Sequence, residues 1–287
     1  MITGIIPFGY FGYVVNQSGS TLLRVDRLIA NDSGFEKFVH GKKYDNLIFQ
    51  KACWVQMMHL FKGPKILDLC DPDWFQYEVN IIETGNLAHA ITCSSLELTD
   101  LLKSYFPDKI VEHVPDRLDL KTFPLPRKAH QGKAKNAVWF GYIHNAHETL
   151  PQMAPAIREA GLHLRIISQL PYTVNDGILE LNPEFVRYDQ SKVYSQIREA
   201  DILLNPRSDK AFFRYKSNNK SLIGWQLGLP VATTNADIMR LMNPKERNRE
   251  VSIMKSVIEQ NYCIEKSVLQ YHEIISRIRQ RCFEKIN

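Results

Sequence analysis

The sequence predicts an α/β protein with two Rossmann-like domains, each a doubly wound parallel sheet, facing each other across a cleft. Two observations support this fold class. Apolar strand candidates alternate with amphipathic helix candidates up to about residue 120, and parallel strands need such helical crossovers. The same alternation starts again at Ala137, after a segment rich in proline, lysine and arginine.

The domain boundaries follow from this break in the pattern. Residues 121–136 are the predicted linker because prolines and cations replace the apolar periodicity there. We expect one domain over 1–120 and a second over 137–250. Residues 251–287 are expected to form helices that pack back towards the first domain. Ligands of open parallel sheets bind at the carboxyl ends of the strands, so the cleft is the predicted site.

The first domain is predicted to begin with a short apolar strand over 2–8. A loop with Gly9, Gly12 and Gly19 follows. These glycines let the backbone approach a ligand closely, although the spacing does not match the dinucleotide-binding motif GxGxxG. Apolar residues then recur at helical spacing after Ser20. Further strands are predicted over 44–50, 65–70, 90–93 and 110–114, with helices over 54–61, 76–86 and from the capping residue Ser95 to Tyr105.

The second domain is predicted to contain strands over 137–143, 163–168, 185–188, 201–205 and 231–234. A loop over 144–148 and a helix that ends at Gly161 follow the first of these strands. Another helix is expected over 192–200, and a loop over 206–213 leads to a helix over 218–227. From Arg249 onwards the sequence predicts helix, with a basic last part that complements the helix dipole.

Composition narrows the class of protein. The 287 residues are 44% hydrophobic and 23% charged, as in globular proteins. The formal net charge of +5 suits an anionic ligand but falls short of the dense basic face of a nucleic-acid-binding domain. Five scattered cysteines without metal-site spacing are expected to be reduced. No apolar run has the length of a transmembrane segment, so we expect a cytoplasmic protein.

The most informative stretch is 213–234. Its cations Arg214, Lys216 and Lys220 are interleaved with polar residues before a short helix, and Gly228 is expected to end this helix as a left-handed cap. A helix N-terminus offers unpaired N–H groups and the positive end of the helix dipole. Such a stretch is either a phosphate-binding site or a solvated charge cluster, and both interpretations remain open at this point.

Several motifs, taken in order, are similar to those of a known family. They lie at 45–51, 65–73, 91–95, 114–119, 140–142, 200–206, 216–220 and 228–231. Together they resemble the GT-B glycosyltransferases, and specifically a divergent member of the retaining group-1 (GT4-like) family. The resemblance implies that the second domain binds a nucleotide-sugar, a UDP- or GDP-sugar, and the first holds the acceptor. It also implies transfer with retention, no metal cofactor, and a glycan or modified DNA as the acceptor.

The resemblance also implies roles for individual residues. The reaction needs positive charge where the leaving phosphate gains negative charge, and this implies catalytic roles for Lys216, Lys220 and Arg214. The donor-binding residues that it implies are Tyr142, His144, Arg207, Ser217, Asn218, Asn219 and Gln226. The acceptor-side residues that it implies are Gly12, Ser20, Asp71 and Asp73, with no metal ligands.

The sequence departs from the family at two positions. The family carries a glutamate that holds the donor five residues before the glycine that corresponds to Gly228, and Ile223 stands there. Tyr215 takes the place of an earlier glutamate. Gln226 either substitutes for the missing group or is an ordinary helix-surface residue. Two further hypotheses follow: a catalytically inactive nucleotide- or sugar-binding scaffold, and a DNA-base glycosyltransferase of the phage type.

Two other motifs have the spacing of metal ligands. Asp71-Pro-Asp73 matches the DxD motif of the other glycosyltransferase fold, GT-A, whose carboxylates share a divalent cation. The second complete domain favours GT-B instead, in which this strand end contacts the acceptor. His144 and His147, followed by Glu148, lack a third ligand at suitable spacing, so we do not expect a zinc site.

Overall fold

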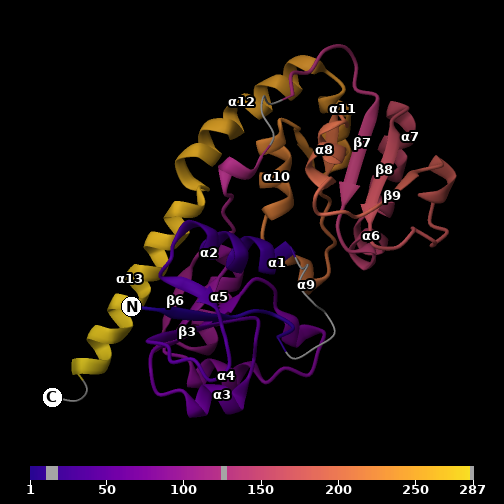
Figure 1. Cartoon of the computed structure of the whole chain (residues 1–287). Coiled ribbons are helices and arrows are strands. Elements are labelled where there is room, and N and C mark those ends of the chain that lie inside the picture. The colour runs from indigo at the N-terminus through magenta and orange to yellow at the C-terminus, as the bar shows by residue number, and fades with distance from the viewer. Residues whose placement is uncertain (11–18, 124–127, 285–287) are drawn as a thin grey trace. The chain divides into compact units, whose positions relative to one another are not determined.

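The computed structural model describes residues 1–10, 19–123 and 128–284, and the predicted acceptor-side residue Gly12 lies outside them. The chain divides into two compact units (Figure 1). Unit 1 contains Met1–Asp119, Ala211–Asn218 and Tyr262–Asn287, and unit 2 contains Leu120–Lys210 and Asn219–Asn261. The cation-rich stretch is therefore divided, because 213–218 belong to unit 1 and 219–234 to unit 2.

Unit 1 is built on a parallel sheet with the strand order β2-β1-β3-β4-β5-β6. β1, β3, β4 and β5 are buried along their whole length, as expected of parallel strands covered by helices on both faces. The edge strand β2 was not predicted, because Phe-Glu-Lys contains no apolar run. The strands are β1 (Thr3–Ile6), β2 (Phe35–Lys37), β3 (Asn46–Gln50), β4 (Lys65–Leu69), β5 (Ala90–Cys93) and β6 (Ile110–His113).

Helices cover both faces of this sheet (Figure 1). One face packs against α3, α4 and α5 through Met58, Ile81 and Leu98. The other face packs against α2 and α13 through Leu28 and Ile275. The helices of unit 1 are α1 (Gly19–Thr21), a π-helical turn (Leu22–Asp26), α2 (Arg27–Asn31), α3 (Val55–Leu60), a 3-10 turn (Asp73–Phe75), α4 (Ile81–Leu87), α5 (Leu96–Tyr105), α9 (Ala211–Arg214) and α13 (Ile264–Glu284).

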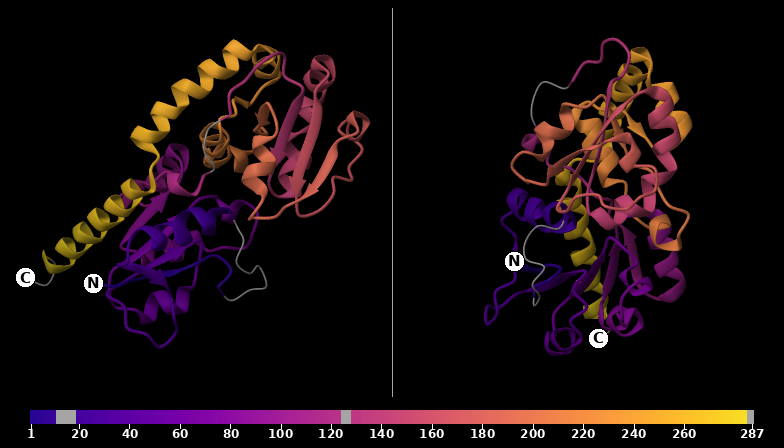
Figure 2. Two further views of the ribbon diagram at one scale, coloured as in Figure 1. Left: turned by 45° about the horizontal axis from the view of Figure 1, so that its top comes forward. Right: turned by 90° about the vertical axis from the view of Figure 1, so that its right-hand side faces the viewer.

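Unit 2 is built on a second parallel sheet with the order β11-β10-β7-β8-β9, and β7, β8 and β9 run side by side in Figure 2. Its strands are β7 (Asn136–Phe140), β8 (His163–Ser168), β9 (Glu184–Arg187), β10 (Ile202–Leu204) and β11 (Val231–Ala232). Its α-helices are α6 (Ile143–Thr149), α7 (Ala154–Ala160), α8 (Val193–Arg198), α10 (Asn219–Leu227), α11 (Asn235–Leu241) and α12 (Pro244–Asn261), and 3-10 turns lie at Leu120–Thr122, Pro151–Met153 and Leu179–Leu181.

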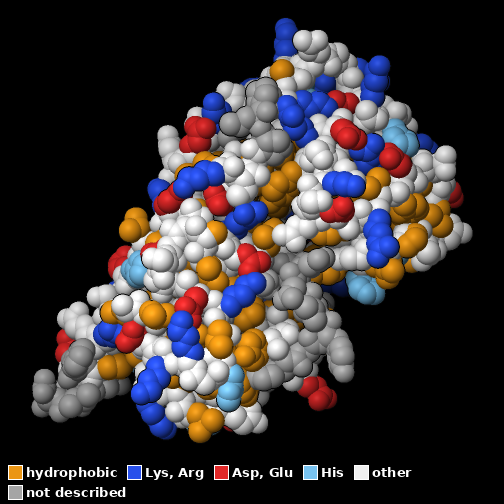
Figure 3. Space-filling model, viewed as in Figure 1, with side chains coloured by type: hydrophobic (Ala, Val, Ile, Leu, Met, Phe, Trp, Pro, Cys, Tyr) orange, Lys and Arg blue, Asp and Glu red, His pale blue; other side chains and the backbone are white. Residues whose placement is uncertain are grey.

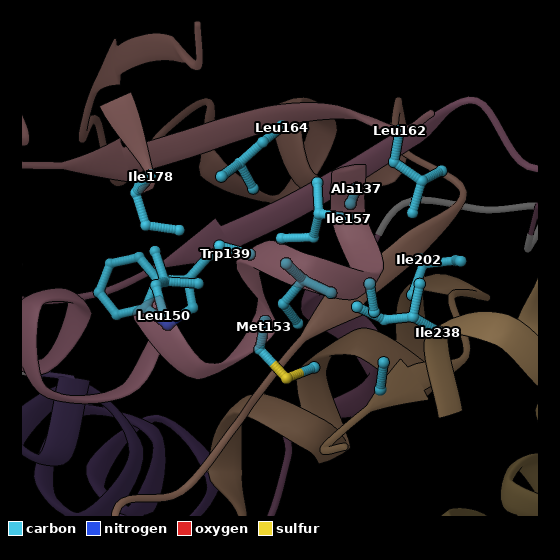
Figure 4. Close-up of a cluster of buried hydrophobic side chains, with 14 of the residues drawn as sticks. Ala137, Trp139, Leu150, Met153, Ile157, Leu162, Leu164, Ile178, Ile202 and Ile238 are labelled. Atoms are coloured by element: carbon cyan, nitrogen blue, oxygen red, sulfur yellow. The ribbon is translucent and has the colours of Figure 1, made fainter. Parts of the chain in front are cut away.

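The core of unit 2 lies between its sheet and α6, α7 and α11. Trp139 points from β7 into this core, where Leu150, Met153 and Ile157 pack, and Ile238 of α11 joins them (Figure 4). All five side chains are at most 1% exposed.

The strand orders locate a switch point in each sheet. In unit 1, β2 lies on one side of β1, and β3 and all later strands lie on the other side, so the switch point falls between β1 and β3. In unit 2, β8 and β9 lie on one side of β7, and β10 and β11 lie on the other, so the switch point falls between β7 and β10. At a switch point the loops that follow neighbouring strands part, which opens a crevice beyond their carboxyl ends. The predicted fold class, two doubly wound parallel sheets, is confirmed, and the switch points show where to look for a site.

Several element boundaries differ from the predictions. The expected strand over 137–143 ends at Phe140 because Gly141 has a φ of 139°. The expected loop over 144–148 is helix α6, and the expected loop over 206–213 contains most of α9. The predicted helix over 76–86 begins only at Ile81, where the side chain of Asn80 caps it. The predicted Ser95 cap and the left-handed Gly228, with a φ of 85°, are both confirmed.

The predicted C-terminal helical region divides between the two units. α11 and α12 belong to unit 2, and α13 belongs to unit 1. The start of α13 is tied to the chain after β6, because the N–H of Leu118 donates to the carbonyl of Tyr262 at 2.8 Å and the N–H of Ile264 donates to that of Leu118 at 3.0 Å. No helix within 1–10, 19–123 or 128–284 combines the length and apolar character needed to cross a bilayer.

The charged surface is mixed in sign. In the view of Figure 3, Lys and Arg side chains alternate with Asp and Glu, and hydrophobic side chains lie between them. Among the described residues on this face, Lys and Arg side chains form no continuous stripe of the kind that binds a nucleic-acid backbone.

A buried arginine connects the segments of unit 1. Arg24, in the π-helical turn, is 5% exposed and donates from Nε and Nη2 to the two carboxylate oxygens of Asp68 on β4, at 2.8 and 2.5 Å. Its Nη1 donates to Asp116, after β6, at 2.9 Å. The hydroxyls of Thr92 and Tyr271 also donate to Asp68, at 2.6 and 2.8 Å. Burial alone would lower the pKa of Arg24. Asp68, Tyr271 and Asp116 outweigh burial and leave this pKa raised, so the guanidinium stays charged.

Replacing Arg24 by methionine should destabilise unit 1 by about 3–5 kcal/mol, because two buried carboxylates would lose their counter-ion. Calorimetric melting would measure the change. The matched control is Arg277→Met, which breaks a 2.7 Å ion pair with Glu112 at a position 41% exposed and should cost less than about 1 kcal/mol. Equal effects of the two substitutions would contradict the prediction.

A buried histidine ties the chain before β7 to α10 and α12. His130 is 4% exposed, and its Nε2 donates to the carbonyl of Gly228 at 2.8 Å. Its backbone N–H and carbonyl are both bonded to the side-chain amide of Asn248, at 3.0 and 2.9 Å. The bond to Gly228 needs a proton on Nε2, which the neutral ring supplies.

The environment of His130 disfavours the charged ring. Burial lowers the pKa of His130 below 6.5, and the charges of Arg247 and Lys128 lower it further, against the opposite effects of the Gly228 carbonyl and Asp201. As the pH falls through about 6.5, the unfolded chain takes up a proton that the folded chain resists, so the stability of unit 2 should decrease. Urea unfolding between about pH 7 and 5 should show this slope, and His130→Asn should reduce it. An unchanged slope in the variant would contradict the prediction.

Candidate functional site

The switch point of unit 2 holds a lysine against the backbone. Gly141 directly follows β7, and a Cβ at this position would lie 2.6 Å from Nζ of Lys220. The ammonium lies 4.2 Å from the ring centroid of Trp139 and 5.7 Å from that of Phe140. The aromatic faces attract the ammonium, and the missing side chain at Gly141 makes room for it. Lys220 is therefore held at the carboxyl end of β7.

The first turn of α10 reaches the same edge of the sheet. Asn219 begins this helix, and Ser221 accepts a hydrogen bond of 2.8 Å from the side-chain amide of Asn205, directly after β10. The N-terminus of α10 thus lies by the carboxyl ends of β7 and β10, on either side of the switch point. The N–H groups of its first turn, its dipole and the Lys220 ammonium together suit an anionic group such as a phosphate. Asn205 was not among the predicted site residues.

The other donor-side residues predicted in unit 2 are placed as follows. Tyr142 comes next to Gly141 and is 44% exposed, and His144 is exposed on the first turn of α6. Arg207 follows β10, and its carbonyl accepts a hydrogen bond of 2.9 Å from Gln152. Tyr142, His144 and Arg207 thus follow the two strands that border the switch point.

The face of α10 that lacks the family's glutamate points into the core. Ile223 is 7% exposed and Gln226 is 4% exposed. The interpretation of Gln226 as a helix-surface residue is therefore wrong. Gln226 also lies six residues beyond Lys220, which is about 9 Å along the helix axis. Because position 223 is buried, an apolar isoleucine side chain packs there without leaving a polar group unsatisfied.

The remaining predicted cations belong to unit 1. The hydroxyl of Ser95 donates to the carbonyl of Tyr215 at 2.7 Å, and that of Ser217 donates to Asp116 at 2.6 Å. These bonds fix the segment that carries Lys216, whose Nζ lies 4.5 Å from the ring centroid of Phe212. Arg214 is exposed. Asn218 ends this segment, and Ser20, predicted on the acceptor side, lies half-buried in α1.

The predicted acceptor-side carboxylates share a lysine that the sequence analysis did not select. Nζ of Lys51, directly after β3, lies 2.9 Å from Asp71 and 3.0 Å from Asp73. Burial raises the pKa of Asp71, but Lys51 and Lys216 outweigh it and leave this pKa lowered. At Asp73 burial prevails and leaves the pKa raised, although Lys51 acts against it. A signal existed in the sequence, since a lysine and two aspartates follow neighbouring predicted strands.

The predicted histidine motif is not assembled as a metal site. The ring of His147 packs against Tyr172 with centroids 4.6 Å apart, and Glu148 forms an ion pair with Lys210. Among the residues that the structure describes, no group of three or more His, Cys, Asp and Glu side chains is placed to hold a metal ion.

The comparisons with known proteins concern the fold. No family model and no curated protein matches the chain. Among solved structures, HepE of Anabaena in complex with UDP-glucose is similar with a TM-score of 0.69, at 10% identity over 96% of this chain and 99% of HepE. The chain has the GT-B fold.

Two other solved structures agree with this result. An alpha-glucosyltransferase in complex with UDP-glucose and DNA containing an abasic site is similar with a TM-score of 0.62, at 12% identity over 96% of this chain and 99% of that chain. AviGT4, a glycosyltransferase involved in avilamycin A biosynthesis, is similar with a TM-score of 0.56, at 10% identity over 96% of this chain and 97% of that chain. The resemblance to GT-B glycosyltransferases is confirmed for the fold, and the retaining group-1 subfamily stays a prediction.

The geometry of unit 2 makes a prediction that needs no knowledge of the substrate. Inorganic pyrophosphate should bind at the switch point, and Lys220→Ala should weaken it about 10- to 100-fold, because a charge-assisted hydrogen bond contributes about 1.5–3 kcal/mol. Isothermal titration would measure this. Lys192→Ala, which removes a lysine of unit 2 that is 70% exposed, is the control and should leave the affinity unchanged. Equal affinities of all three proteins would contradict the assignment of Lys220.

Proposed function

We propose that the protein is a glycosyltransferase that moves a sugar from a nucleotide-sugar donor to an acceptor hydroxyl. The observation that carries the proposal is the placement of Lys220 over Gly141, beside the first turn of α10, at the switch point of unit 2. The fold supports it, because solved structures of this fold include glycosyltransferases in complex with UDP and with UDP-glucose.

The proposed role of Lys220 follows from the charge that develops in the reaction. When the bond between the sugar and the diphosphate breaks, negative charge increases on the leaving phosphate oxygens. A fixed ammonium and oriented N–H groups stabilise that charge more than they stabilise the bound donor, which lowers the barrier. The predicted roles of Lys216 and Arg214 on the diphosphate stay predictions, and in unit 1 the charge of Lys216 acts on Asp71 and Asp73.

The donor would be held without the family's glutamate. Position 223 is filled by a buried isoleucine, so we propose that contacts to the ribose and base come from residues at the strand ends. Tyr142 suits this role because this aromatic residue is 44% exposed directly after β7. Its neighbour Tyr188 follows β9, and burial together with Tyr142 raises the pKa of Tyr188. Of the donors expected from the sequence, UDP-glucose is the first to test because HepE binds it, and GDP-sugars are the second.

We propose that the reaction needs no metal ion and retains the anomeric configuration. The first part is supported by Lys51, whose ammonium lies between the two carboxylates of the DxD-like motif Asp71-Pro-Asp73. The second part rests on the sequence resemblance. The acceptor is proposed to be a glycan hydroxyl, and a hydroxyl on modified DNA is the second candidate because one structural relative binds DNA.

Release of UDP from UDP-glucose in the presence of an acceptor panel tests the proposal. We expect release that EDTA does not reduce, and Lys220→Ala should lower kcat about 100-fold because it removes one stabilising group of the leaving phosphate. Lys192→Ala should act as wild type. Proton NMR of the product would give the anomeric configuration.

Three outcomes would change the conclusion. Binding of UDP-glucose without transfer to any acceptor or hydrolysis would favour the inactive nucleotide-binding scaffold. Release that depends on a divalent cation would overturn metal independence. Salt-sensitive binding and modification of duplex DNA would select the DNA acceptor over the glycan.

A further inference from the structure

Lys51 lies between the two carboxylates of the Asp71-Pro-Asp73 motif. Nζ of Lys51 contacts Oδ2 of Asp71 and Oδ2 of Asp73, at 2.9 and 3.0 Å. The Lys51 side chain is 8% exposed, whereas those of Asp71 and Asp73 are 23% and 16% exposed. The ammonium is therefore enclosed, and each carboxylate keeps part of its surface towards solvent.

The backbone at Lys51 is in a conformation that suits glycine. Its φ is 53°, in the left-handed region that L-residues other than Asn and Asp rarely adopt. Its N–H donates to the carbonyl of Asp68 at 2.8 Å, so the pairing of β3 with β4 holds it there. Glycine would adopt this conformation without strain. A strained position that nevertheless carries a long cationic side chain points to a use for that side chain.

The surroundings of Lys51 favour its charged form. Burial lowers the pKa of Lys51, but Cys70, Asp71 and Asp73 act against burial and leave this pKa raised. The ring centroid of Phe8, after β1, lies 4.8 Å from Nζ and adds a cation–π contact. Phe8 and Lys51 follow the two strands that border the switch point of unit 1, so the cluster lies where this sheet is expected to bind a ligand.

The cluster is balanced in charge and close to exposed aromatic surface. Lys216 adds a second positive charge that acts on both Asp71 and Asp73. Phe75, two residues after Asp73, is 41% exposed, and its ring packs edge-on against Tyr215 with centroids 5.7 Å apart. Carboxylate oxygens that accept hydrogen bonds beside an apolar ring suit a neutral, hydroxyl-bearing molecule better than an anion.

We propose that Lys51 is a positioning residue for the transfer reaction. Its ammonium takes the place of a metal ion in orienting Asp71 and Asp73, and their remaining oxygen lone pairs accept hydrogen bonds from hydroxyls of the acceptor. The activity part of this inference rests on the proposed function. The metal-replacement part rests on the geometry of unit 1 alone, so the two can fail separately.

Lys51→Gly tests the proposal because glycine relieves the backbone strain and removes the side chain that carries the ammonium. We expect this variant to bind one Mn²⁺ in a titration followed by electron paramagnetic resonance, because Asp71 and Asp73 then lack a counter-ion. Wild type should not bind Mn²⁺ at this site, and the double variant Lys51→Gly/Asp73→Asn should lose the binding again. Lys42→Gly, which breaks an ion pair with Glu36 at a position 42% exposed, is the control and should not bind Mn²⁺.

The activity readout separates positioning from a purely structural role. Transfer by Lys51→Gly should fall about 100-fold, because carboxylates displaced by about 1 Å no longer hold the acceptor in place. The KM for the acceptor should rise while the KM for the donor stays unchanged, and Mn²⁺ should restore part of the rate. Lys51→Arg keeps a cation at this position, so it should retain most of the activity and bind no Mn²⁺.

Two results would overturn the proposal: wild-type transfer by Lys51→Gly, or a folded Lys51→Gly protein that binds no Mn²⁺. If glycine prevents folding, Lys51→Met carries the same two readouts with the side-chain volume preserved. If the wild-type protein transfers no sugar, the proposed function fails, and the Mn²⁺ titration still decides whether Lys51 replaces a cation.

Discussion

Unit 1 depends on the buried ion-pair network around Arg24. A guanidinium that is 5% exposed has lost its hydration, and only a complete set of acceptors compensates for that loss. Asp68 accepts hydrogen bonds from Arg24 with both of its carboxylate oxygens, and Asp116 accepts another. Every partner is satisfied only when β4, the π-helical turn and the chain after β6 take the arrangement seen in the structure. Asp116 also accepts the hydroxyl of Ser217. The network therefore fixes the segment that carries Lys216.

The two candidate sites, one in each unit, each hold a lysine in the same way. At each switch point a lysine lies against a backbone of unusual conformation: Lys220 over Gly141 in unit 2, and Lys51 on its own left-handed backbone in unit 1. Each ammonium also has an aromatic ring nearby, Trp139 or Phe8. Burial against rings and carboxylates reduces the freedom of a long side chain, so the charge is in place before a substrate arrives.

Much of the fold and part of the site could be predicted from local patterns. The Ser95 and Gly228 caps depend on residues a few positions apart, and both were predicted. Position 223 was recognised as a departure from the family, but its burial in unit 2 depends on which face of α10 packs, which no local pattern gives. Gln226 was misplaced on the surface for the same reason. Two short elements, β2 and α9, were missed because three or four residues carry too little periodicity.

The sequence by itself determined the alternation of strands and helices, the position of the break between two sheets and the cations before α10, because hydrophobic periodicity and capping act over a few residues. Only the tertiary structure decided which charges meet. Lys51 is 20 residues from Asp71 along the chain, and Lys220 is 79 residues from Gly141. Their contacts arise because parallel strands bring their carboxyl ends to one edge, and the strand order selects which ends are neighbours.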